Sequence, residues 1–152
     1  MSNRDRSHRP RAVIFGCAGP TLSDDERAFF AAADPLGFIL FKRNCQTPKQ
    51  VRQLTKDLRE AVGRQEAPIL IDQEGGRVAR LGPPHWPPLP AARRFGELAE
   101  TDRAKAREAA TLNGRLIAHM LYKLGITVNC APVCDVPVAG ALEYVDADGT
   151  PS

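Results

Sequence analysis

A chain of 152 residues with 43% hydrophobic and 26% charged residues is long enough for one compact domain, and its composition is not that of a disordered, collagen-like or disulfide-dense protein. The formal net charge of +3 is spread along the sequence after an arginine-rich start, so it gives no continuous basic face for nucleic acid. No apolar run approaches the ~18 residues of a membrane-spanning helix and none follows the polar start, so we expect a cytoplasmic protein that binds neither nucleic acid nor membrane.

The first two predicted strands flank a helix with a clear start signal. The apolar run at residues 12–15 predicts a buried strand. Ser23, followed three residues later by Glu26, forms a capping-box pattern, which predicts a helix that runs through Ala33. A second apolar run at residues 37–41 then predicts the second strand.

A proline marks the start of the second predicted helix. Thr47 is the expected cap, and Pro48 takes the first helical position, where its missing amide hydrogen costs nothing. Apolar residues then recur on one face until Gly63, which is expected to end the helix. Residues 68–71 predict a third strand, and the proline-rich stretch of residues 83–90 predicts a loop.

The last predicted helix is the longest. Residues 101–124 carry apolar side chains at helical spacing and are followed by Gly125, before a fourth apolar strand at residues 126–131. Nearly continuous apolar strands that alternate with amphipathic helices predict an α/β fold with a parallel sheet. Two architectures fit: an open doubly wound sheet, or the N-terminal half of a (β/α)8 TIM-type barrel, since a closed barrel takes ~250 residues.

Ligands of parallel α/β folds gather at the C-terminal ends of the strands, so polar residues just after each apolar run are the candidate site residues. They are Arg43 and Asn44, residues 72–80, and Cys134 and Asp135. Asp72 and Glu74 are two residues apart, which aims both carboxylates the same way if the strand continues. The glycine pair after them allows a tight turn, and Arg77 and Arg80 follow.

A carboxylate beside a guanidinium offers acceptors and forked donors, which suits the recognition of adjacent sugar hydroxyls. Alternatively, Asp72 and Arg77 form a structural ion pair at the strand end, and the residues alone leave both interpretations open. His85 and Trp86 could form an aromatic wall for a ligand, but local packing is favoured. Asp135 is interpreted as a helix cap.

Other kinds of site lack support in the sequence. It has no GxGxxG after the first strand, no P-loop motif, no GxSxG and no HExxH. The four cysteines lie in or beside apolar segments, which favours free thiols. The closest pair, Cys130 and Cys134, has no second cysteine or histidine pair at zinc-finger spacing, so we expect no metal ion.

Four short segments, taken together, form a more specific pattern. The longest is ILIDQEGGRVAR at residues 69–80. Three others occur in the chain: GFILFKRN at residues 37–44, PLP at residues 88–90 and NCAPVCDV at residues 129–136. Over residues 11–138 the sequence therefore resembles the β-N-acetylhexosaminidases of glycoside hydrolase family 3 that act in peptidoglycan recycling.

This resemblance implies a (β/α)8 barrel that hydrolyses terminal β-linked N-acetylglucosamine of muropeptides by a retaining mechanism, with no metal ion or other cofactor. It also implies that Asp72 holds sugar hydroxyls in the −1 subsite and that Arg80 helps to bind the same sugar. Four further residues are expected to support these two: Arg43, Asn44, Glu74 and Arg77.

The resemblance also indicates which groups these 152 residues do not contain. Retaining hydrolysis needs a carboxylate nucleophile and an acid/base group. The family carries its acid/base histidine in a KHFPGHG-type segment and following loop, and its aspartate nucleophile further on, both beyond the equivalent of residue 138. We therefore expect an inactive fragment without a catalytic residue of its own.

The expected organisation is a polar tail over residues 1–10, a partial barrel over residues 11–138 and a divergent tail over residues 139–152. Half a barrel would leave strand edges unpaired, so self-association is expected as well. Two other hypotheses stay open at this point: a non-catalytic sugar-binding protein, and an unrelated open α/β domain.

Overall fold

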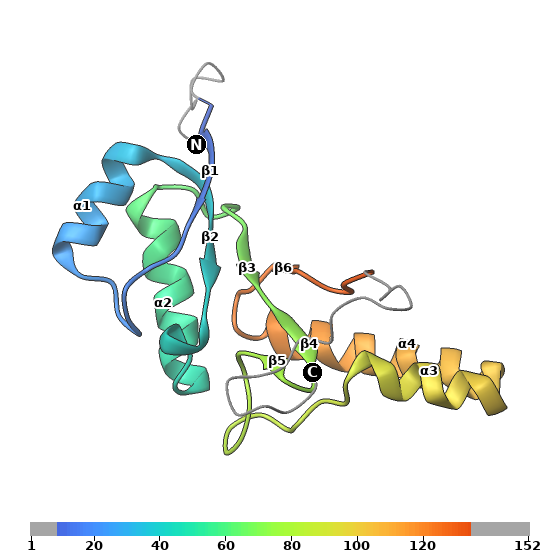
Figure 1. Cartoon of the computed structure of the whole chain (residues 1–152). Coiled ribbons are helices and arrows are strands. Elements are labelled where there is room, and N and C mark those ends of the chain that lie inside the picture. Colours follow the sequence, from blue (N-terminus) through green and yellow to red (C-terminus); the bar gives the residue numbers. More distant parts are fainter. Residues whose placement is uncertain (1–8, 135–152) are drawn as a thin grey trace, which may run out of the picture.

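The structure is a computed structural model that describes residues 9–134 of the chain. The tail predicted over residues 139–152, most of the predicted N-terminal tail, and Asp135 lie outside the described residues. Strands and helices alternate in the predicted order, with one hairpin and one helix in addition (Figure 1). The α/β class is therefore confirmed.

The first unit is built as its start signal predicts. It consists of β1 (Arg11–Phe15), α1 (Asp24–Ala33) and β2 (Pro35–Leu40). Ser23 Oγ accepts a hydrogen bond from the backbone N–H of Glu26 at 3.2 Å, and Glu26 Oε2 accepts one from the backbone N–H of Ser23, also at 3.2 Å. The reciprocal capping box thus satisfies two amides at the start of α1.

The second unit buries its predicted apolar face. It consists of the short 3₁₀ turn η1 (Lys42–Asn44), α2 (Pro48–Ala61) and β3 (Ile69–Ile71). Thr47 Oγ1 caps α2 by accepting from the backbone N–H of Gln50 at 3.2 Å. Val51, Leu54 and Leu58 are at most 1% exposed, so α2 contributes one complete face to the core.

The chain leaves the parallel sheet at Asp72, a feature that the sequence does not predict. The next strands, β4 (Gln73–Gly75) and β5 (Val78–Ala79), form a separate antiparallel hairpin. Gly75 and Gly76 have φ angles of +99° and +60°, and a Cβ atom on Gly75 would lie 2.2 Å from the carbonyl oxygen of Pro90. Because β3 does not continue, the condition for Asp72 and Glu74 to point the same way is not met.

The last unit contains two helices where the sequence predicts one. α4 (Arg103–Tyr122) corresponds to the predicted helix, α3 (Ala92–Thr101) precedes it, and β6 (Val128–Asn129) is shorter than the predicted strand. α3 has no buried residue, and its N-cap, Ala91, makes no side-chain hydrogen bond. Its sequence therefore carries no start signal of the kind that marks α1 and α2.

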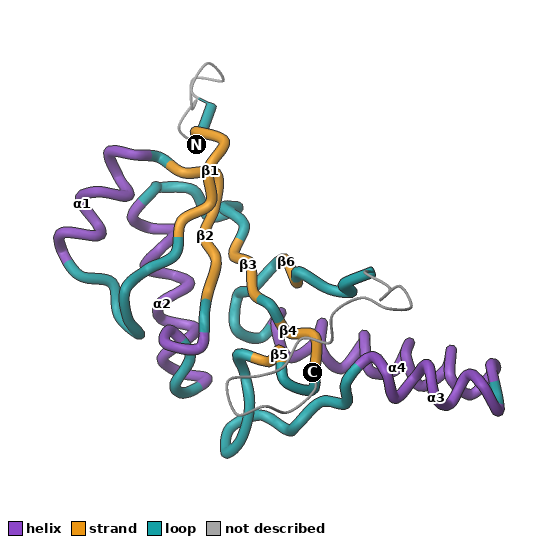
Figure 2. The backbone as a smooth tube through the Cα atoms, in the orientation of Figure 1, coloured by secondary structure: helices purple, strands orange, loops and turns teal. Residues whose placement is uncertain are grey.

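Four strands form one parallel sheet in the order β1-β2-β3-β6 (Figure 2). Each strand pairs with the next parallel strand along the chain, whereas the strand order of a doubly wound sheet reverses at a switch point. The order is that of the beginning of a (β/α)8 barrel, and the barrel is not closed within residues 9–134. β1 and β6 are therefore the two edges of the described sheet.

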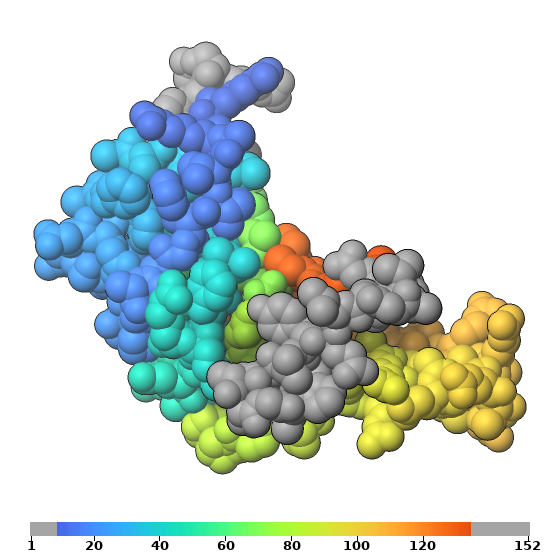
Figure 3. All heavy atoms as spheres, viewed as in Figure 1, coloured from blue at the N-terminus to red at the C-terminus, as the bar shows by residue number. Residues whose placement is uncertain are grey.

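The core lies between the sheet and the helices that cover it. Most of its largest fully buried apolar side chains come from β2, α2 and β3: Phe38, Leu40, Leu54, Leu58, Ile69 and Ile71. α3 and α4 pack on each other and form an arm beside this body, yellow to orange in Figure 3. No helix in the described part of the chain has the length and apolar character to cross a membrane.

Two side chains of α2 connect it to distant loops. Thr55 Oγ1 donates to the carbonyl of Leu124 at 2.8 Å, and Arg59 Nη2 donates to the carbonyl of Gly125 at 2.8 Å. Arg59 Nε also donates to the carbonyl of Ala67 at 3.1 Å. The segments that lead into β3 and β6 are thereby fixed to one helix, and three carbonyls find partners inside the protein.

Candidate functional site

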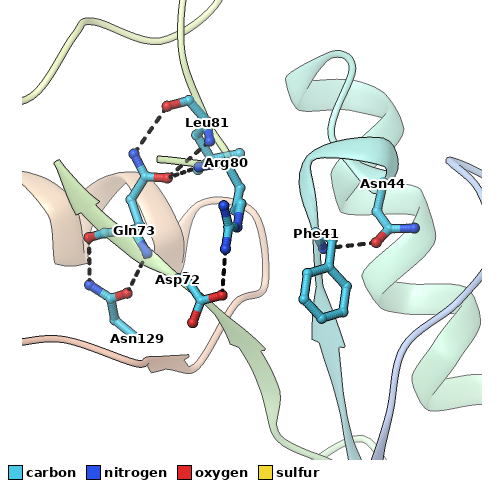
Figure 4. A network of polar contacts seen from close by, with 7 residues as sticks. All are labelled: Phe41, Asn44, Asp72, Gln73, Arg80, Leu81 and Asn129. Atoms are coloured by element: carbon cyan, nitrogen blue, oxygen red, sulfur yellow. Dashed lines mark hydrogen bonds and ion pairs between the residues drawn. The ribbon is translucent and has the colours of Figure 1, made fainter. Parts of the chain in front are cut away.

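The C-terminal ends of β2, β3 and β6 lie at one edge of the parallel sheet, and polar side chains gather there (Figure 4). Asp72 follows β3 directly, and its carboxylate points toward Arg80 in the loop after β5 (Figure 4). Asn129 lies at the end of β6 on the neighbouring strand. The fold thus brings together residues that the sequence separates by more than fifty positions.

Asp72 and Arg80 form an ion pair, with 2.8 Å between Arg80 Nη2 and Asp72 Oδ2. The side chains are 27% exposed for Arg80 and 24% exposed for Asp72, so the pair is partly desolvated but still reachable by a ligand. Arg80 Nε is buried and has no hydrogen-bond partner among the described residues. The pair therefore keeps acceptor and donor capacity beyond the bond between its two members.

Gln73 fixes the position of Arg80. Its side chain is fully buried, and its Oε1 accepts from the backbone N–H groups of Arg80 and Leu81, both at 2.9 Å. Its Nε2 donates to the carbonyl of Leu81 at 3.0 Å. All three bonds hold the loop after β5 against the end of β3, so the guanidinium is presented beside Asp72 without depending on the ion pair alone.

Asn129 fixes Gln73 in turn. Its Oδ1 accepts from the backbone N–H of Gln73 at 2.9 Å, and its Nδ2 donates to the carbonyl of Gln73 at 3.0 Å. The side-chain amide thus pairs with the backbone as a neighbouring strand would. No role for either residue is predicted from the sequence, although a glutamine between two carboxylates at a buried strand end is a signal for such a role.

Asn44 and Arg43 are engaged with the protein's own loops. Asn44 is fully buried: its Oδ1 accepts from the backbone N–H of Phe41 at 2.8 Å, and its Nδ2 donates to the carbonyls of Cys17 and Gly19 at 3.1 and 2.8 Å. The Arg43 guanidinium lies 4.7 Å from the centre of the Phe41 ring, and its Nε donates to the carbonyl of Cys17 at 3.1 Å. Both residues therefore hold the loop after β1 against the loop after β2.

Neither Glu74 nor Arg77 is a member of the Asp72–Arg80 ion pair. Glu74 lines a groove of about 570 Å³ that runs along α3, α4 and the end of β6, and neither Asp72 nor Arg80 lines this groove. Arg77 is exposed in the turn between β4 and β5. The ion pair of Asp72 is formed with Arg80 and not with Arg77, the partner that the sequence leaves open.

His85 and Trp86 are packed locally. Trp86 is 8% exposed and belongs to the core cluster, whereas His85 is exposed. The two rings meet edge to face with 5.9 Å between their centres. The favoured interpretation, local packing, agrees with this arrangement.

All four cysteines carry free thiols. Cys17 and Cys45 are buried, and burial raises the pKa of each to about 11, so both stay protonated at neutral pH. Cys134 is exposed, and Cys130 is half-buried at the end of β6. Among residues 9–134 there is no group of three or more histidine, cysteine or acidic side chains arranged to hold a metal ion.

Comparison with known proteins gives one consistent result. The profile of the glycosyl hydrolase family 3 N terminal domain matches residues 18–141. A β-hexosaminidase of Bordetella avium is 34% identical over 127 residues, and one of Alkalilimnicola ehrlichii is 37% identical over 124 residues. These alignments cover 84% and 82% of this chain but 36% and 35% of the relatives, so the chain spans about a third of their length.

Solved structures agree. NagZ from Neisseria gonorrhoeae, in complex with N-trifluoroacetyl-D-glucosamine, superposes with a TM-score of 0.77 at 33% identity, over 85% of this chain and 38% of that chain. A family 3 β-N-acetylglucosaminidase from Paenibacillus sp. gives a TM-score of 0.66 at 32% identity, over 78% of this chain and 22% of that chain. Sequence and backbone thus point to the same group of proteins.

Proposed function

The chain belongs to glycosyl hydrolase family 3, and we propose that it forms the first part of a β-N-acetylhexosaminidase, a retaining O-glycosyl hydrolase. In this proposal Asp72 and Arg80 bind a terminal β-linked N-acetylglucosamine of a peptidoglycan-derived muropeptide. The observation that carries it is the partly exposed ion pair at the C-terminal edge of the sheet. Barrels of this kind bind their substrates at that edge.

The chemistry of the pair suits a sugar. An ionised carboxylate can accept hydrogen bonds from two adjacent hydroxyls, and a guanidinium can donate to ring or hydroxyl oxygens. Because Arg80 already compensates the charge of Asp72, a neutral ligand can bind without bringing a counter-ion. An N-acetylated amino sugar with free hydroxyls is such a ligand.

We assign the bond-breaking groups to a part of the barrel that lies outside the described residues 9–134. A retaining mechanism places two reacting groups on either side of the scissile bond, about 5–5.5 Å apart when both are carboxylates. Asp72 is held by Arg80, and Glu74 lines a different groove, so neither suits nucleophilic attack. The proposed roles of the described residues are therefore binding and support.

The cytoplasm is the compartment that we propose for this reaction. All four cysteines are free, and Cys134 is exposed to solvent. Reduced thiols are typical of the cytoplasm, where disulfides are rare.

Sugar binding is tested by saturation-transfer NMR with N-acetylglucosamine, a method that detects weak ligands. We expect signal with the 152-residue polypeptide and loss of it in Asp72→Asn, which keeps the shape but removes the charge. Asp25→Asn, on an exposed position of α1, is the matched control and should keep the signal. Equal signals from all three proteins would refute the assignment of Asp72.

Catalysis is tested with a chromogenic β-N-acetylglucosaminide. We expect no turnover above the buffer rate, because the reacting groups are not among the assigned residues. Turnover that disappears in Asp72→Ala would contradict the inactivity of this polypeptide, although it would support the assigned sugar site.

A further inference from the structure

Cys130 lies at the same edge of the sheet as Asp72. β3 and β6 pair in register, with Leu70 opposite Val128 and Ile71 opposite Asn129. The backbone N–H of Cys130 donates to the carbonyl of Ile71 at 2.9 Å, so the pairing extends to this residue. The next pair in this register is Asp72 and Cys130.

Side chains at paired positions of neighbouring strands lie on the same face of a sheet. The register therefore places the Cys130 thiol on the face that carries the Asp72 carboxylate. Cys130 is half-buried, and burial together with the nearby charge of Asp72 raises the pKa of the thiol. At neutral pH the sulfur keeps its proton and can donate it to the carboxylate.

We propose that Cys130 is a positioning residue of the sugar site, which orients the Asp72 carboxylate together with Arg80. The inference rests on the proposed function, since it concerns the same site. Arg80 approaches Asp72 from the loop after β5, and Cys130 approaches it from the neighbouring strand. Two donors from different elements restrict the rotation of one carboxylate, which prepares it for a ligand.

The proposal has a chemical consequence for the thiol. A sugar bound at Asp72 covers Cys130, so it shields the sulfur from alkylating reagents. In the reaction with iodoacetamide, the thiolate sulfur forms a bond to the methylene carbon, the carbon–iodine bond breaks, iodide leaves with the electron pair, and the thiol proton goes to solvent. Alkylation of Cys130 in turn places a carboxamidomethyl group beside Asp72 and blocks the sugar.

The contact between Cys130 and Asp72 is tested first without any sugar. Alkylation of each cysteine is followed by peptide mass spectrometry in the parent and in Asp72→Asn. Removal of the charge lowers the pKa of the Cys130 thiol toward its ordinary value, so we expect its alkylation at pH 8 to become several-fold faster. Cys134 is the reference thiol, and its rate should not change.

The same experiment reports whether the variant is folded. Cys17 and Cys45 are buried and protonated, so they stay unreactive as long as the core is intact. An unchanged Cys130 rate in a variant whose buried cysteines remain protected would overturn the proposed contact.

Two further arms test the role in binding. Increasing concentrations of N-acetylglucosamine, up to saturation, should slow the alkylation of Cys130 in proportion to the occupied fraction of the site. The alkylation rate of Cys134 should stay the same. Cys130→Ser, which keeps a donor, should bind the sugar nearly as the parent does, whereas Cys130→Ala should bind it several-fold more weakly. Equal affinity of Cys130→Ala and the parent would overturn the positioning role.

These outcomes separate the two proposals. If N-acetylglucosamine gives no NMR signal with the parent, the proposed function fails and the positioning role fails with it. If the sugar binds in a manner that depends on Asp72 but neither shields Cys130 nor senses its replacement, only the role of Cys130 is wrong.

Discussion

Two stretches of similar length behave differently in this molecule, although each contains strands and helices. Residues 11–71, the closed region, expose two large apolar side chains, Phe29 and Leu36. Residues 72–134, the open region, expose five: Leu112, Leu116, Tyr122, Val128 and Val133. The closed region covers its apolar surface with its own helices, whereas the open region leaves such surface along α4 and β6. Strand–helix units of one barrel therefore do not contribute equally to a common core.

Truncation of a leucine side chain should give the largest difference in stability between the two regions. We expect Leu54→Ala, on the fully buried face of α2, to lower the free energy of unfolding by about 2–5 kcal/mol, because it leaves a cavity in the closed region. The matched change Leu116→Ala, at a position of α4 that is 45% exposed, should stay within about 0.5 kcal/mol. Urea unfolding at low protein concentration measures both, and equal losses would abolish the distinction.

The join between the regions depends on Gln73. Gln73→Leu keeps the volume but leaves the backbone N–H groups of Arg80 and Leu81 unpaired in a buried place, and we expect a loss of about 2–3 kcal/mol. Sugar binding should fall as well, because Arg80 loses its fixed position. Gln53→Leu on the exposed side of α2 is the matched control, with an expected change within about 0.5 kcal/mol. A tolerated Gln73→Leu would mean that the ion pair alone fixes the loop.

The open edge of the sheet should cause self-association. Val128 is 38% exposed on β6, an edge of the described sheet, and unpaired strand edges bind other strands. We expect Val128→Lys to weaken self-association about tenfold, which corresponds to ~1.4 kcal/mol. Leu36→Lys is the control, because Leu36 is 42% exposed but lies on β2, an inner strand. Light scattering over a concentration series measures the difference, and a parent that is monomeric throughout would contradict the prediction.

Loss of the capping box of α1 should have the smallest effect on stability. This effect should depend on pH and concern only the closed region. Burial opposes ionisation of Glu26, but hydrogen bonds from Ala18 and Ser23 outweigh it and lower its pKa. Because the pKa of Glu26 is lowered, its ionised carboxylate stabilises the fold at pH values above the ordinary glutamate pKa of about 4.3. This contribution disappears as the pH falls through the pKa that Glu26 has in the folded protein. We expect Glu26→Gln to cost about 1 kcal/mol at neutral pH and almost nothing in strong acid.

Glu108→Gln, on the exposed face of α4, is the control for this measurement and should leave the unfolding curve unchanged at both pH values. If Glu26→Gln loses the same stability in acid as at neutral pH, the carboxylate hydrogen bonds are not its source.

The closed region could be predicted from the sequence almost completely, because its signals are local. Ser23 with Glu26 and Thr47 with Pro48 mark helix starts within a few residues, and the apolar spacing of α2 marks its buried face. The open region could not, because its features depend on distant partners. The hairpin after Asp72 needs Pro90 against Gly75, and α3 has no cap and no buried side chain.

The candidate site shows the same division. The sequence indicates that Asp72 and Arg80 are important, since both follow an apolar strand in a long motif. It cannot show that Arg80 and not Arg77 pairs with Asp72, because that choice depends on the hairpin and on Gln73. Asn129 and Cys130 join the site only because β6 pairs with β3. This pairing brings Asn129 to Gln73, from which it is fifty-six residues away in the sequence.

Two side chains of α2 donate to carbonyl groups that come much later in the sequence, and this sets an order of assembly during synthesis. Thr55 donates to the carbonyl of a residue 69 positions later, and Arg59 to one 66 positions later. On the ribosome α2 is therefore complete long before its partners exist, and the early strands can assemble around it first. The loop at Leu124 and Gly125 then docks onto a helix that is already formed. Arrival of β6 thus follows the assembly of the earlier strands, guided by two donors that are already in place.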